Sequence, residues 1–225
     1  MYLKWGEEKI TDWSEENIEQ QYERGFVFTR LGKGLMQQTR SLRVDLSKFE
    51  LSSENRRILR NVNNLQFEIC KLPYKKYSWE IGKMAKDFYD TKFGDKTFSA
   101  NKARELLTDE AKSNFNTLIE FRGQTSGIPE DWPQGYATCY ASKNILHYSY
   151  PFYSLSGATA KDMGLGMMTR AVTWAKEQGK RYVYLGSASR PTDTYKLQFA
   201  GIEWWDGSKW QTDLDTLRGH LRGSN

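Results

Sequence analysis

The chain has 225 residues, which is enough to bury one large hydrophobic core or two small ones. Its 8 Trp, 13 Tyr and 11 Phe exclude an intrinsically disordered chain, and no apolar run is long enough to span a membrane. The first residues, MYLKWGEEKITDW, lack the apolar core of a secretory signal, so we expect a cytoplasmic protein without a membrane partner. The 33 Lys and Arg exceed the 28 Asp and Glu, which fits either polyanionic partners or a moderately basic surface.

Capped helices and alternating strands make up the first part of the chain. Ser14 as N-cap and Gly25 as a stop signal predict a short helix between them. Further helices are predicted at 52–62, at 76–94, where apolar residues recur with helical spacing, and at 99–107. Alternating residues predict strands at 26–31, 40–46 and 65–72.

A polar loop with Gly and Pro, RGQTSGIPEDWPQG, divides the chain, so we expect an N-terminal α/β part at 1–122 and a C-terminal part at 123–225 within one compact unit. In the second part, the residue pattern predicts two strands, then a glycine-bearing turn that opens a helix near Gly164, and then the strand YVYLG. After these come TDTYKLQFAG as a closing helix, a hairpin with Asp206-Gly207 at its tip, and a basic polar tail. The order predicts an α+β fold with a mixed, mostly antiparallel sheet.

Two isolated cysteines, Cys70 and Cys139, have no C-x-x-C spacing. We interpret them as small buried residues rather than as a metal site or a disulfide.

The stretch Lys161-x-x-Gly164-x-Gly166, between a strand and a helix, resembles the acyl-coenzyme A loop of the GNAT acyltransferase fold. Glycines allow backbone N–H groups to approach an anion closely, and the positive end of the helix dipole adds attraction. The resemblance implies that Lys161, Gly164, Leu165 and Gly166 bind the donor, together with Lys196. The alternative is a tight turn that caps a helix of the core.

Short motifs also follow one another over most of the chain: RGFVFTR, TRSLRVDLSKFELSSENRRILRN, YPFY at 150–153, YVYLG, Tyr195-Lys196-x-x-Phe199 and Trp210. In residues and order they resemble the arginyl- and leucyl-tRNA–protein transferases, the aminoacyltransferases of the N-end rule. The resemblance implies a GNAT-type acyltransferase fold with an N-terminal α/β extension. It also implies an EC 2.3-class transferase that uses aminoacyl-tRNA as co-substrate, with tRNA and a protein or peptide N-terminus as partners.

The chain departs from that family at three places. Lys33, Met36 and Thr39 stand where the family often has a cysteine cluster, so we expect no metal or iron–sulfur site. Ser154 replaces an aspartate of the family, and the loop from Gly186 to Tyr195 is shorter than the family's. That loop is expected near the acyl end of the donor, which leaves the identity of the donor open.

The chemistry expected of such a site is modest, because the amino acid on charged tRNA is already an activated ester. The enzyme has to align an amine, accept its proton and stabilise an oxyanion. Tyr195 is the candidate that protonates the leaving group, and its alternative role is to pack between helix and sheet. Tyr150 or Tyr153 is expected to line the acyl pocket, since strand alternation puts them on opposite sides. His147 is expected to be a half-buried strand residue rather than a base.

Basic residues are the candidates for recognising tRNA phosphates or an acidic acceptor terminus. Arg56 and Arg60 are four residues apart on one helix face, with Arg57 beside them, and the family motif adds Arg43. A solvated helix face is the alternative for the three helical arginines.

The function that these motifs favour is transfer of an amino acid from charged tRNA to an α-amine. One alternative is a GNAT N-acetyltransferase that uses acetyl-coenzyme A. Another is a non-catalytic module that binds tRNA or a protein N-terminus.

Overall fold

The fold is described from a computed structural model, which covers residues 3–123, 133–155 and 160–223, without the side chains of residues 160 and 161. The chain forms two compact units that are discontinuous in sequence. The first comprises residues 1–56, 141–147 and 172–225, and the second comprises residues 57–140 and 148–171. The units therefore do not follow the boundary predicted between residues 122 and 123.

The first unit begins with a small antiparallel sheet and one helix. Its elements are β1 (Gly6–Lys9), α1 (Glu15–Glu23), β2 (Phe26–Phe28) and β3 (Leu35–Gln38), with strand order β1-β3-β2. The predicted start of α1 is confirmed, because the Ser14 hydroxyl accepts a hydrogen bond from the Asn17 amide at 3.4 Å. Behind this sheet, Tyr22 and Phe28 are buried and pack edge to face.

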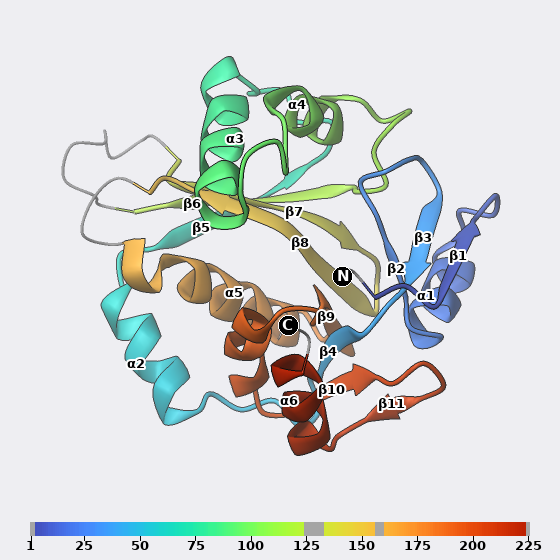
Figure 1. The fold of residues 1–225 in the computed structure, drawn as a ribbon. Helices are drawn as coiled ribbons and strands as arrows, with labels where there is room; N and C mark the ends of the chain where they lie inside the picture. The colour runs from blue at the N-terminus through green and yellow to red at the C-terminus, as the bar shows by residue number, and fades with distance from the viewer. Residues whose placement is uncertain (1–2, 124–132, 156–159, 224–225) are drawn as a thin grey trace. The chain divides into compact units, whose positions relative to one another are not determined.

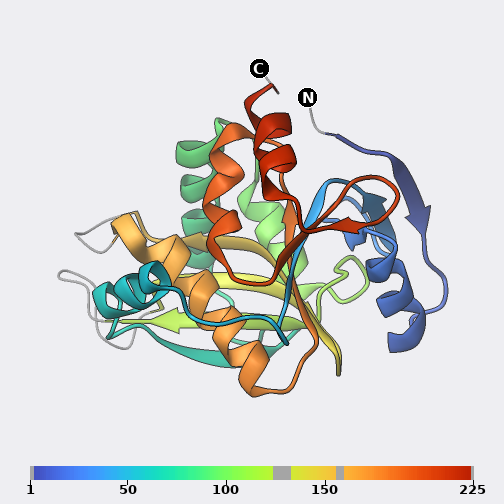
Figure 2. The same cartoon turned by 90° about the horizontal axis from the view of Figure 1, so that it is seen from below.

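The first unit also contains five strands of a larger sheet, in the order β11-β10-β4-β9-β8. They are β4 (Ser41–Asp45), the start of β8 (Ile145–Tyr153), β9 (Tyr182–Ser187), β10 (Ile202–Trp205) and β11 (Trp210–Gln211). Between β9 and β10 lies the 3₁₀ helix η1 (Pro191–Gln198), and α6 (Leu214–Arg222) lies beside it (Figure 2). The predicted closing helix is therefore present, but as a 3₁₀ helix.

The second unit contains the strand order β8-β7-β6-β5, with helices on both faces (Figure 1). Its elements are β5 (Gln66–Lys71), α3 (Trp79–Phe93), α4 (Ala100–Thr108), β6 (Thr117–Arg122), β7 (Gly135–Ala141) and most of β8. Two helices contribute residues to both units, namely α2 (Ser53–Asn61) and α5 (Ala160–Glu177). Figure 1 shows α3 and α4 on one face of β5–β8 and the start of α5 on the other.

Strand pairing confirms the predicted fold class. β8 and β9 pair in parallel, with His147 opposite Tyr184, and α5 connects them as a crossover helix. The pairs β1–β3, β2–β3, β4–β9, β4–β10, β10–β11, β5–β6 and β6–β7 are antiparallel. The fold is thus a mixed, mostly antiparallel sheet flanked by helices.

Some elements differ from those predicted. The residues expected as a basic polar tail form α6, where Asp213 caps the amides of Asp215 and Thr216. Leu217 and Leu221 are buried one turn apart, and this pair is short enough to be missed as a helical pattern. The strands β1, β3 and β6 were also not predicted. β6 is buried on both faces, so it lacks the alternation that marks a half-buried strand.

Candidate functional site

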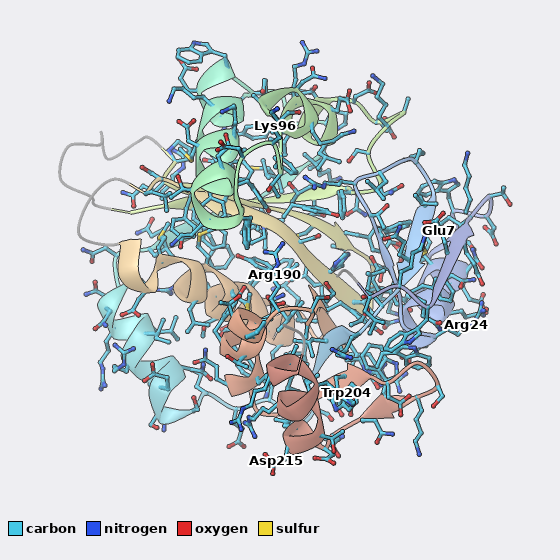
Figure 3. All side chains as sticks on the ribbon, in the orientation of Figure 1. Glu7, Arg24, Lys96, Arg190, Trp204 and Asp215 are labelled. Atoms are coloured by element: carbon cyan, nitrogen blue, oxygen red, sulfur yellow. The ribbon has the colours of Figure 1, made fainter. Side chains whose placement is uncertain are left out.

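The end of β9 and the start of η1 form a fixed turn in the first unit. Asp193 accepts hydrogen bonds at 2.9 Å from the backbone amides of Ser189 and Arg190, which caps η1. Pro191 occupies the first position of η1, where its missing N–H costs no hydrogen bond. Figure 3 labels Arg190 at this start of η1. The turn places the two predicted site residues Tyr195 and Lys196 on a rigid element.

Lys196 is a largely buried amine on η1. Its Nζ donates to the carbonyl oxygen of Ser187 at 2.9 Å and lies 3.7 Å from Oδ1 of Asp193, and its side chain is 12% exposed. Burial lowers the pKa of Lys196, the charge of Asp193 opposes this effect, and the charge of Arg190 adds to it. A buried cation of this kind acts strongly on any negative charge that develops nearby.

Tyr195 lies next to Lys196 and is 45% exposed, with the Lys196 Nζ 5.9 Å from the centre of its ring. Partial burial, together with the negative charge of Asp193, raises the pKa of the Tyr195 phenol above its ordinary value. The phenol therefore stays protonated at neutral pH and can donate a hydrogen bond. Its exposure shows that Tyr195 is not packed inside the core.

His147 on β8 is 1% exposed, so it is fully buried rather than half-buried as predicted. Its Nδ1 lies 2.9 Å from the hydroxyl of Tyr22. Burial, with a smaller contribution from the charge of Lys196, lowers the pKa of His147 to about 3. A neutral imidazole with this pKa is a weak base, which agrees with the expectation that His147 is not the catalytic base.

Two polar atoms near this turn have no hydrogen-bond partner among the described residues. They are Nε of Arg40 and Oγ of Ser189. The backbone holds Arg40 beside β9, because its carbonyl oxygen accepts from the amide of Ala188 at 2.8 Å. Sequence reasoning missed Arg40, and an arginine directly before a strand gave no signal for it. Buried polar atoms without partners are the groups that gain most from a bound ligand.

In the second unit, the helix that was predicted to start near Gly164 begins at Ala160 as α5. Gly164 and Gly166 therefore lie inside the helix rather than in a turn before it. A Cβ on Gly164 would lie 3.1 Å from Cε1 of Tyr153, and one on Gly166 would lie 2.6 Å from Cγ2 of Val62. Both glycines allow α5 to pack closely against neighbouring side chains. In a phosphate-binding loop, by contrast, glycines would serve to expose backbone N–H groups to the ligand.

The other two predicted donor-binding residues of this stretch are also helical. Leu165 is half-buried on α5, and the side chain of Lys161 lies outside the described residues. Asp162, in the first turn, accepts from Nδ2 of Asn61 at 2.7 Å and pairs with Arg57 at 3.4 Å. A role of this stretch in donor binding stays a prediction.

Replacing Gly166 with alanine should lower the free energy of unfolding by about 1–3 kcal/mol, because the added Cβ overlaps Val62. Gly219 in α6 is the matched control, since a Cβ there meets no atom within 4 Å. Gly219→Ala should be neutral or raise the free energy of unfolding by up to about 1 kcal/mol through helix propensity. Urea unfolding of both variants measures the contrast. Equal effects at the two positions would contradict the packing explanation.

Tyr150 and Tyr153 do not follow the strict alternation that was used to place them. Tyr150 has a φ of 42°, which interrupts the regular strand at this residue. Its ring packs against Phe98 and Phe115, while the ring of Tyr153 lies 4.7 Å from that of Phe88. Both rings therefore contact aromatic side chains of the second unit, and Tyr153 is the more buried of the two.

The three helical arginines on α2 are exposed. Arg56 donates to the carbonyl oxygen of Leu51, and Arg57 pairs with Asp162. Arg60 makes no ion pair with a described residue. Of the three, Arg60 is the one whose guanidinium is most available to an anionic ligand.

Arg43, the fourth predicted arginine, is buried on β4 in the first unit. It donates at 2.8 Å to both Glu203 and Glu23, and its guanidinium carbon lies 3.9 Å and 4.1 Å from the ring centres of Tyr182 and Trp210. Burial by itself would lower the pKa of Arg43, but Tyr184 and Glu23 raise it above its ordinary value. Arg43 thus has internal partners on both sides, and its predicted contact with phosphate or an acidic terminus stays a prediction.

No metal ligands gather in the part of the chain that the structure describes, where no three His, Cys, Asp or Glu side chains form a group that could hold an ion. The described helices include none that is both long and apolar enough to cross a membrane. The two cysteines are free, with Cys139 buried and Cys70 partly exposed.

No family model matches the chain, and no curated protein matches it. Among solved structures it is similar to the C-terminal domain of a putative lysylphosphatidylglycerol synthetase from Agrobacterium fabrum, with 14% identity and a TM-score of 0.45 over 80% of this chain and 55% of that one. L-PGS from Bacillus licheniformis gives 13% identity and a TM-score of 0.46 over 92% of this chain and 62% of that one. FemX gives 11% identity and a TM-score of 0.46 over 77% and 60%. The chain thus spans less than two thirds of each of these structures, and likenesses this distant carry no conclusion about activity.

Proposed function

We propose that the protein is an aminoacyltransferase that moves an amino acid from charged tRNA to the α-amine of a protein or peptide. The observation that carries the proposal is the pairing of an exposed, protonated Tyr195 with a buried Lys196 at the end of β9. Both belong to the Tyr195-Lys196-x-x-Phe199 motif through which the sequence resembles the tRNA–protein transferases.

The reaction is the aminolysis of an ester. The acceptor amine attacks the ester carbonyl, its nitrogen loses a proton, and the 3′ oxygen of the tRNA ribose leaves and takes up a proton. The Lys196 ammonium stabilises the negative charge on the carbonyl oxygen in the tetrahedral intermediate. The Tyr195 phenol donates its hydrogen bond, and then its proton, to the leaving oxygen, and the phenolate is restored by the proton that the amine nitrogen loses, carried to it by water. The raised pKa of Tyr195 keeps the phenol protonated at neutral pH, so that a proton is present for the leaving oxygen.

The alternative donor, acetyl-coenzyme A, has less support. Its pyrophosphate was expected at the glycines of the stretch around Gly164 and Gly166. Both glycines are inside α5, where helical hydrogen bonds occupy the backbone N–H groups beyond the first turn. Only the N–H groups at the very start of α5 are left for an anion.

The experiment is a transfer assay with two donors. The protein is mixed with an acceptor peptide and with either tRNA charged with a radiolabelled amino acid or labelled acetyl-coenzyme A. We expect label in the peptide from charged tRNA, and a rate that falls about 10²-fold in Tyr195→Phe, which removes only the hydroxyl. Transfer from acetyl-coenzyme A alone would overturn the proposal. Binding of tRNA without transfer would identify a non-catalytic module.

A further inference from the structure

The segment that joins β5 to α3 in the second unit carries an unusual set of exposed side chains. The backbone holds this segment in place, since the amides of Leu72 and Tyr74 donate to the carbonyl oxygens of Asn116 at 3.0 Å and Leu107 at 2.7 Å. The side chain of Tyr74 is buried beneath it. The segment lies between the last strand of the sheet and the helix pair α3–α4 (Figure 1). Its outward-pointing residues are therefore presented from a fixed backbone.

Four cations gather at this segment without a carboxylate partner. Lys71, Lys75, Lys76 and Arg104 are exposed, and none forms an ion pair with any residue that the structure describes. Arg104, on α4, donates to the side-chain oxygen of Asn101 at 2.9 Å, and its charge acts on Tyr77 within the segment. Unpaired cations repel one another, so an arrangement of four is unfavourable for the protein alone.

The lysines on the neighbouring helix show the opposite arrangement. Lys83 and Lys86 of α3 are each paired with an aspartate four residues further on, Asp87 and Asp90. These two lysines of α3 are thus each balanced by a neighbouring aspartate. The four cations at the segment before α3 have no such carboxylate partner among the described residues. The carboxylate that follows the segment directly in sequence is that of Glu80, and this single negative charge is fewer than the four positive charges gathered at the segment.

Trp79 completes the surface. It is the first residue of α3 and, at 68%, is the most exposed of the large apolar side chains among the described residues. It lies directly after the segment that carries Lys75 and Lys76, three to four residues beyond them in sequence. We call Lys71, Lys75, Lys76, Trp79 and Arg104 the basic–aromatic surface.

We propose that the basic–aromatic surface binds a single-stranded stretch of RNA, with phosphates on the four cations and a base stacked on Trp79. Unpaired cations beside an exposed aromatic ring are the combination that single-stranded nucleic acids require. An acidic peptide would use the cations but would leave the indole face without a planar partner. The inference rests on the proposed function in that it names a surface for the tRNA donor.

The test measures binding of fluorescently labelled, uncharged tRNA and of a short single-stranded RNA by anisotropy over a salt series. Lys75→Ala/Lys76→Ala should weaken binding at least tenfold and reduce the salt slope by about 1.4 to 1.8, because two phosphate contacts are lost. Trp79→Ala should weaken binding about tenfold with the salt slope unchanged. The control, Lys83→Ala/Lys86→Ala, removes the same charge from the neighbouring helix and should bind RNA like the parent. The unfolding midpoint of each variant checks that the fold is intact.

RNA binding that is the same in all variants would overturn the inference and leave the proposed transferase untouched. RNA binding lost in the surface variants, by a protein that transfers no amino acid, would support the inference while the proposed function fails. Equal weakening by the surface pair and by the Lys83/Lys86 control would show that only net charge matters, which also overturns it. Binding of the surface to vesicles of anionic lipid, without binding to RNA, overturns it as well.

Discussion

Replacing Lys196 with methionine is expected to lower the single-turnover rate of aminoacyl transfer by about 10²–10³-fold. The substitution keeps the length of the side chain and removes the charge that stabilises the oxyanion in the proposed mechanism. The substitution also leaves Asp193, whose side chain is 17% exposed, without this counter-charge, so the unfolding midpoint should fall and the rate is measured on the folded fraction. Asp193 keeps its hydrogen bonds to the amides of Ser189 and Arg190, so the turn that caps η1 remains. The dissociation constant for charged tRNA should stay close to that of the parent.

Lys209→Met is the matched control for this prediction. Lys209 is an exposed lysine between β10 and β11, so the substitution makes the same change in charge away from η1. It should leave the rate unchanged. A structural role for Lys196 predicts instead a lower unfolding midpoint with a normal rate for the folded fraction. That pattern would contradict its placement in the catalytic machinery.

The glycines of α5 show how one residue type can have two physical causes. A glycine pattern between strand and helix is the same in sequence whether the glycines expose backbone N–H groups or make room for a neighbour. The second cause depends on Val62, which lies about 100 residues before Gly166, and on Tyr153, which lies about 10 residues before Gly164. No local pattern reveals these contacts. By contrast, the start of α1 was predictable because its Ser14 cap acts within three residues.

Arg43 shows the same limit for charged residues. Its motif predicted the position on a strand correctly, but its partners Glu23, Glu203 and Trp210 are distant in sequence. Pairing of β4 with β10 places Glu203 directly opposite Arg43. Only the register of the sheet, which composition does not specify, turns an apparent ligand-binding arginine into a buried one.

Replacing Arg43 with methionine is expected to lower the free energy of unfolding by about 3–5 kcal/mol. Among the described residues, the change leaves Glu203, which is 8% exposed, with the ammonium of Lys48 at 3.4 Å as its one counter-charge. It also removes the guanidinium from between the rings of Tyr182 and Trp210. Urea unfolding monitored by circular dichroism measures the loss. Arg43→Lys should fall between the parent and Arg43→Met, because an ammonium keeps the charge but not the flat, two-sided contact.

The double variant Arg43→Met/Glu203→Leu distinguishes the cost of an unpaired charge from the cost of lost packing. If the buried carboxylate causes most of the loss, the double variant should recover much of the stability that Arg43→Met loses. The prediction from sequence alone, that Arg43 binds tRNA phosphate or an acidic terminus, requires the opposite result. Under that hypothesis Arg43→Met keeps its unfolding free energy within about 0.5 kcal/mol and weakens substrate binding. Because stability and binding are measured independently on the same variant, an unchanged free energy of unfolding contradicts the structural role and unchanged substrate binding contradicts the binding role.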